Sequence, residues 1–93
     1  MLVGILKLEL FFPAPNSLKA KRFVLKRIAE RVRRRFNVSV SEIDYHDKWQ
    51  RSVLGVSIVG IDKRFMNSVL DKVIDTVEEV HEAEILDQGM QFI

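Results

Sequence analysis

The amino-acid sequence predicts an α+β fold in which a four-stranded antiparallel sheet carries two helices on one face. Two observations lead to this prediction. Four segments have the alternating or β-branched pattern of strands, and two have apolar residues at the helical spacing of three and four. Their order along the chain is β-α-β-β-α-β, and right-handed crossovers then place both helices on the same face of the sheet. This arrangement is the ferredoxin-like sandwich.

The first strand is predicted over Leu2–Phe12, where apolar residues at alternate positions give the strand one inward face. Pro13 and Pro15 are expected to end it, because proline has no N–H to donate to a sheet ladder. Asn16 or Ser17 then offers a side-chain oxygen that caps the start of a helix.

The first helix is predicted over residues 17–36, where apolar residues form one stripe along the helix. The stripe consists of Leu18, Leu25, Ile28, Ala29, Val32 and Phe36. Asn37 is expected to close the helix, because asparagine tolerates the left-handed conformation found at helix C-termini. A short strand is expected to follow over Val38–Ile43.

The remaining elements follow the same two patterns. Asp44–Gln50 is polar and is predicted to be a connection between strands, and Ser52–Val59 is β-branched and alternating, as in a strand. Asp62 is expected to cap a second amphipathic helix that ends near Val80. Ala83–Ile93 is expected to form the last strand.

Composition predicts one globular domain over residues 1–93, since 47% of the residues are hydrophobic and no linker interrupts the pattern. The absence of cysteine excludes disulfides, thiolate nucleophiles and cysteine-ligated zinc. The N-terminal segment is not expected to be a signal peptide, because Lys7 and Glu9 interrupt it. No apolar run approaches the roughly 20 residues of a membrane helix. We therefore expect a cytoplasmic protein that makes no membrane contact.

Charge is distributed unevenly along the chain, although the net charge is only +2. Residues 1–61 hold 12 Lys and Arg against 5 Asp and Glu, whereas residues 62–93 hold 3 against 8. This division predicts a molecule with one positive and one negative side, and therefore a charged partner.

The first predicted helix carries most of the positive charge, with Glu30 as its single acidic residue. Only Glu30 offers ion pairs within the helix, so mutual repulsion of the cations is expected to destabilise it unless a polyanion binds. Lys21 lies near the apolar stripe, and its ammonium is expected to reach water past a buried stem. Phe23 is predicted to be an exposed aromatic residue among the cations.

Three interpretations of this basic face remain open: a nucleic-acid interface, a solvated face without a partner, and a contact with an acidic protein. We favour nucleic acid, because lysine and arginine neutralise phosphates and exposed aromatic rings stack on bases. The residues expected to contact nucleic acid are Lys19, Arg22, Phe23, Lys26, Arg27, Arg33, Arg34, Trp49 and Arg51.

Trp49 is the only tryptophan and belongs to the polar connection that follows the second predicted strand. A structural role, with the ring packed beneath the helix, is the preferred interpretation. The alternative is an exposed ring beside Arg51, which would provide a stacking platform for a base.

Catalytic and metal-binding patterns are missing from the sequence. The two histidines, His46 and His81, lie far apart and show no metal-ligand spacing. No serine has a nucleophile-elbow context and no glycine-rich loop is present. The third strand contains no aromatic residue, which disfavours RNA binding through the sheet as in an RRM. We therefore predict a protein that is not an enzyme and uses no cofactor.

One face of the predicted sheet has no helix to cover it. Its residues are predicted to be Val3, Ile5, Lys7, Glu9, Val53 and Val59. Apolar side chains on an open face are typical of an interface, and the simplest partner is a second copy of the chain. Scattered exposed valines that need no partner are the alternative.

The run SLKAKRFVLKRIAERVRRRFNVSVSE, followed by DKWQR and GVSIV, resembles the YlxP-like family of small bacterial proteins of unknown function. The similarity spans nearly the whole chain and implies the ferredoxin-like fold. The genetic neighbourhood typical of the family implies an RNA or ribosome context, without a settled activity. We therefore expect a non-catalytic module associated with RNA or the ribosome, and the alternative is a module that binds an acidic protein.

Overall fold

The computed structural model describes residues 1–14 and 16–93, so the predicted role of Pro15 in ending the first strand lies outside the described residues. It contains four strands and two helices in the predicted order. The elements are β1 (Leu2–Phe11), α1 (Leu18–Arg35), β2 (Ser39–Asp44), β3 (Arg51–Gly60), α2 (Lys63–Glu78) and β4 (Glu84–Phe92).

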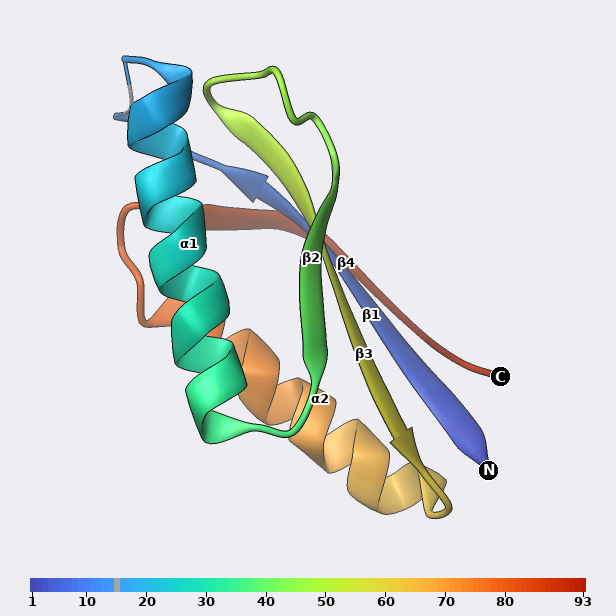
Figure 1. Cartoon of the computed structure of the whole chain (residues 1–93). Coiled ribbons are helices and arrows are strands. Elements are labelled where there is room, and N and C mark those ends of the chain that lie inside the picture. The colour runs from blue at the N-terminus through green and yellow to red at the C-terminus, as the bar shows by residue number, and fades with distance from the viewer. Residues whose placement is uncertain (15) are drawn as a thin grey trace.

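The strands form one antiparallel sheet in the order β2-β3-β1-β4. Both helices lie on one side of this sheet, and its other face is open (Figure 1). The ferredoxin-like fold predicted from the sequence is therefore confirmed. Within the described residues, neither helix is long and apolar enough to cross a membrane.

The core lies between the sheet and the two helices. Alternate residues of β1, among them Leu6 and Leu8, are fully buried, and Leu54 of β3 lies directly opposite Leu8. From the helix layer, Val32 of α1 and Leu70 of α2 are also completely buried. The apolar residues that alternate along the strands and those that form the stripes of the helices thus pack together in a single cluster.

The predicted helix caps are correct at both N-termini. The Ser17 side chain accepts a hydrogen bond from the Ala20 amide at 3.1 Å, and Asp62 caps α2 in the same way. The prediction for Asn37 is wrong: α1 ends at Arg35, and the capping residue Phe36 has an extended backbone. Among the described non-glycine residues, only Tyr45 adopts a positive φ, of 61°.

Both outer strands of the sheet contain a register shift. In β2 the shift falls between Glu42 and Asp44, and in β4 it falls opposite the step from Glu9 to Leu10 of β1. Each shift inserts an extra residue on the outer strand, which bends the strand and strengthens its twist.

Lys21 departs from the sequence prediction, because its side chain is completely buried instead of reaching water. Its ammonium Nζ donates hydrogen bonds to Glu42 Oε2 at 3.0 Å, to the Tyr45 carbonyl at 2.8 Å and to the Arg51 carbonyl at 3.1 Å. Glu42 Oε2 also accepts a hydrogen bond from the Ser52 hydroxyl at 2.7 Å.

This cluster satisfies every donor of the buried ammonium, since a lysine side chain has three N–H groups. Desolvating a charge costs several kcal/mol, and the charge is retained only when a counter-charge and hydrogen bonds compensate for lost water. Lys21 therefore fastens α1 to β2, to β3 and to the connection between them.

Replacing Lys21 by methionine keeps the apolar stem but removes the counter-charge of Glu42 and one donor from each of the three acceptors, the Glu42 carboxylate and the carbonyls of Tyr45 and Arg51. We expect the free energy of unfolding to fall by about 3–5 kcal/mol, as when one partner of a buried ion pair is removed. Urea denaturation measures this change. The control is Lys19→Met on the exposed side of the same helix, which should stay within about 0.5 kcal/mol of the wild type. Equal stability of both variants would show that the buried ammonium is dispensable.

Candidate nucleic-acid interface

Apart from the buried Lys21, the cations of α1 divide into those that pair with carboxylates from residues 62–93 and those that do not. Successive residues are rotated by about 100°, so Arg27, Arg31 and Arg35 at four-residue spacing form one row. This row contacts the C-terminal end of α2 and the loop beyond it, and we call it the α2-facing row.

Carboxylates from the acidic third of the chain neutralise the α2-facing row. Arg27 Nη1 lies 2.7 Å from Glu82 Oε2, and its Nη2 donates to Glu82 Oε1 at 3.1 Å, so the contact is bidentate. Glu79 lies 2.9 Å from Arg35 and 3.6 Å from Arg31. The expectation that only Glu30 relieves repulsion on this helix is therefore wrong.

These ion pairs shift the titration of the groups that form them. The hydrogen bond from Arg35, together with the charges of Arg35 and Arg31, lowers the pKa of Glu79 below its ordinary value of 4.5. The hydrogen bond from Arg27 lowers the pKa of Glu82 in the same direction. The same contacts raise the pKa of Arg27 and of Arg35. The carboxylates thus remain ionised over the physiological range.

The second group of α1 residues is exposed and forms no ion pair with the described carboxylates of α2 or of the loop beyond it, and we call it the outward face. It consists of Lys19, Arg22, Phe23, Lys26, Glu30 and Arg34, all of which are exposed. Lys26 and Glu30 are 4.0 Å apart, at the limit of an ion pair. Lys19, Arg22 and Arg34 form no ion pair with any described residue.

Phe23 lies among these cations with 67% of its surface exposed, as the sequence predicts. Lys19 is one helical turn before it and Lys26 is one turn after it, so both are its neighbours on the helix surface. Among the described residues, Phe23 does not belong to the apolar cluster between the sheet and the helices.

Arg33 is assigned to neither the α2-facing row nor the outward face, because its guanidinium binds the protein backbone. Its Nη2 donates a hydrogen bond of 2.6 Å to the carbonyl of Val40 on β2. Arg33, Arg22 and Lys26 line a hollow between α1 and β2 whose floor includes Leu54. A phosphate contact by Arg33, as predicted from the sequence, would therefore use the N–H groups of the guanidinium that do not bind the Val40 carbonyl.

Trp49 is exposed, which contradicts the preferred prediction of a structural role beneath the helix. Its side chain keeps 53% of its surface accessible in the connection between β2 and β3. The connection lies beside the N-terminal end of α1 and not beneath the helix (Figure 1), so residues 46–50 are all exposed. Arg51 is not free to join it, because its guanidinium pairs with Glu9 and lies 5.3 Å from the centre of the Tyr45 ring.

The open face of the sheet carries the residues predicted for it. In the register, Val3 lies opposite Val59, and Lys7 lies opposite Gly55 of β3 and Gly89 of β4. Because those two positions have no side chain, hollows flank Lys7, one of which has a volume of about 410 Å³. Val59 is 62% exposed. A homodimer through this face stays a prediction.

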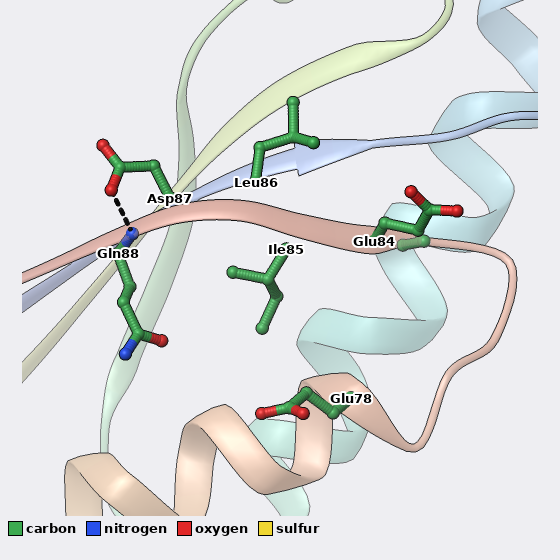
Figure 2. Close-up of a pocket in the computed structure, with 7 residues that line it drawn as sticks. Glu78, Glu84, Ile85, Leu86, Asp87 and Gln88 are labelled. Atoms are coloured by element: carbon green, nitrogen blue, oxygen red, sulfur yellow. Dashed lines mark hydrogen bonds between the residues drawn. The ribbon is translucent and has the colours of Figure 1, made fainter.

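A further hollow, of about 510 Å³, lies between the end of α2 and β4. It carries the carboxylates of Glu78, Glu84 and Asp87, with the Ile85 side chain between the strand and the helix (Figure 2). Asp87 accepts a hydrogen bond from the Gln88 amide at 2.9 Å. The described residues include no group of three ligands placed to hold a metal ion. The carboxylates of this hollow repel phosphate.

Comparison with known proteins gives a family but no activity. A family model described as "Protein of unknown function (DUF503)" matches residues 3–90. The "Uncharacterized protein YlxP" of Bacillus subtilis (strain 168) is 39% identical over 83 residues, which cover 89% of this chain and 90% of that protein.

Solved structures resemble the chain in fold alone, because their sequence identities are low. A de novo designed protein with a ferredoxin fold, LFR1 1, matches with a TM-score of 0.59 and 12% identity, over 100% of this chain and 84% of its own. The designed protein Foldit4 matches with a TM-score of 0.57 and 16% identity, over 100% and 97%. A C-terminal segment of the aIF2 alpha subunit from Pyrococcus abyssi matches with a TM-score of 0.53 and 19% identity, over 90% and 48%.

The ion pairs of the α2-facing row predict a stability that depends on pH. A carboxylate whose pKa is lower in the folded chain stabilises it above the unfolded pKa, and this contribution is lost as the pH falls through the folded value. The free energy of unfolding should therefore decline as the pH falls below about 4.5. Urea denaturation of the wild type and of the Glu79→Gln/Glu82→Gln variant at several pH values measures it.

The double variant should lack the part of the acid-induced decline that comes from Glu79 and Glu82. The matched control is Glu78→Gln, since Glu78 is also exposed at the end of α2 but forms no ion pair with a described residue. An identical pH profile for the double variant and the wild type would contradict the prediction.

Proposed function

The chain belongs to the DUF503 family of proteins of unknown function, and we propose that it is a non-catalytic binding module that associates with RNA or the ribosome. The phosphates contact the outward face of α1. Lys19, Arg22, Lys26 and Arg34 provide the positive charge, and the exposed aromatic ring of Phe23 lies between them.

One observation carries this proposal: the tertiary structure neutralises the α2-facing row of α1 cations, whereas Lys19, Arg22 and Arg34 on the outward face form no ion pair with a described residue. Glu82 pairs with Arg27, and Glu79 pairs with Arg31 and Arg35. On the outward face the one available carboxylate, Glu30, lies 4.0 Å from Lys26. Counterions gather at such a face, and their release on contact with phosphates drives association.

The alternative function is a contact between the same face and an acidic protein. Aromatic residues and arginine are common at the centre of protein interfaces as well, so composition does not separate the two. We favour RNA because a strand of phosphates matches a row of cations along a helix, whereas most of the outward face lacks the apolar residues of an interface core.

A second proposal concerns the open face of the sheet, which we propose is covered by a second copy of the chain. Val3, Ile5 and Val59 make one end of this face apolar, and neither helix covers it (Figure 1). Lys7 and Glu9 stand on the same face, so a copy rotated by a two-fold axis meets it with both signs of charge. The outward face of α1 stays free in such a dimer.

The variant Arg22→Glu/Lys26→Glu tests the RNA proposal. Reversing two outward charges should lower the affinity for RNA at least about tenfold and flatten the salt dependence, by roughly 0.7 in log–log slope for each lost phosphate contact. Filter binding or fluorescence anisotropy at several salt concentrations measures both effects.

The matched control is Arg64→Glu/Lys72→Glu, which makes the same change in charge at exposed positions of α2. Its affinity should remain within a few-fold of the wild type. RNA affinity that is unchanged by reversal of Arg22 and Lys26 would refute the proposal. Loss of a nuclease-resistant protein partner in that variant would instead support the acidic-protein alternative.

The substitution Val59→Glu tests self-association. A carboxylate at the apolar end of the open face should dissociate the dimer, because burying a charge without a partner is unfavourable. Sedimentation velocity should then show a dimer for the wild type and a monomer for the variant. Phe65→Glu is the control, since Phe65 is exposed to a similar degree, 63%, but lies on α2. A wild type that sediments as a monomer at high concentration would exclude the dimer.

A further inference from the structure

The connection between β2 and β3, residues 45–50, is held in place by the same buried lysine that belongs to α1. Lys21 Nζ donates to the carbonyl of Tyr45 at the start of this connection and to the carbonyl of Arg51 at its end. One ammonium thus closes both ends of the connection. Figure 1 shows the connection beside the N-terminal end of α1.

Further hydrogen bonds fix the interior of the connection. The Lys48 amide donates to the Tyr45 carbonyl at 3.1 Å, which forms a tight turn. The Gln50 carbonyl accepts from the Phe12 amide at 2.9 Å, and its side chain donates to the Pro13 carbonyl at 3.2 Å. Lys48 ends this turn and Trp49 lies between it and the hydrogen-bonded Gln50, and both residues are exposed.

An exposed tryptophan on an anchored turn is suited to stacking. Its indole ring offers a large flat surface, and it loses little conformational freedom on binding because the backbone beneath it is already fixed. The ammonium of Lys48 adjoins it in sequence, and Lys19 and Arg22 flank Lys21 on α1. Proteins hold single-stranded nucleic acid by combining such exposed rings with cations, so that bases stack on the rings and phosphates contact lysine and arginine.

We propose that Trp49 stacks on an unpaired base, so that the ligand of this module is single-stranded or looped RNA and not an uninterrupted duplex. The inference rests on the proposed RNA-binding function and deepens it. In an A-form duplex the faces of internal bases are covered by their neighbours, so an indole ring finds no free base to stack on. The hydrogen bonds of Lys21 attach the connection that carries this ring to α1, the helix whose cations are proposed to contact phosphates.

The test uses Trp49 as its own probe, because it is the only tryptophan in the chain. Intrinsic fluorescence is recorded while a short single-stranded oligoadenylate is added, and again with the same strand annealed to its complement. The single strand should quench Trp49 strongly and the duplex only weakly. In anisotropy measurements Trp49→Ala should lower the single-strand affinity about tenfold, and Trp49→Phe should retain most of it.

Phe65→Ala serves as the control, since it removes an exposed aromatic ring from α2 and should leave the affinity unchanged. Urea denaturation confirms that Trp49→Ala is folded. Single-strand binding that depends on Arg22 and Lys26, but neither quenches Trp49 nor weakens in Trp49→Ala, would overturn the inference while the proposed function stands. Failure of the wild type to bind either RNA would overturn both.

Discussion

The fold depends on one buried charge. Lys21 brings an ammonium into the interior, where it is stable only because Glu42 and two backbone carbonyls surround it. Apolar packing alone does not specify the rotation of a helix on a sheet so strictly, since leucines and valines tolerate small shifts. A fully coordinated ammonium allows a single position. The register of α1 against β2 and β3 is therefore fixed by hydrogen bonds as well as by shape.

The same position of α1 determines which of its cations are available. With Lys21 turned inward, the row that contains Arg27, Arg31 and Arg35 meets the carboxylates at the end of α2. The opposite side of the helix then faces water. Two of the carboxylates in the acidic third of the chain, those of Glu79 and Glu82, therefore serve as counter-charges for α1. The basic face is narrower than the count of lysines and arginines implies.

Local patterns could be predicted from the sequence, and pairings between distant residues could not. The alternation of Leu6 and Leu8 and the caps at Ser17 and Asp62 depend on neighbours in the chain, and they were predicted correctly. The burial of the Lys21 side chain depends on hydrogen-bond acceptors that lie 21 to 30 residues further along the chain. The pairing of Arg27 with a carboxylate 55 residues further along depends on the packing of two helices. Helical periodicity places a residue on a face but does not identify what lies against it.

The two register shifts in the outer strands have a consequence for how the protein behaves when crowded. A flat outer strand with free amides and carbonyls is a template on which strands of other molecules add, which leads to fibrils. Here β2 and β4 are both bent by an inserted residue, and Arg33 occupies a carbonyl of β2. Neither border of the sheet presents a straight ladder to a neighbouring molecule. These features disfavour the addition of a further strand at either edge of the sheet.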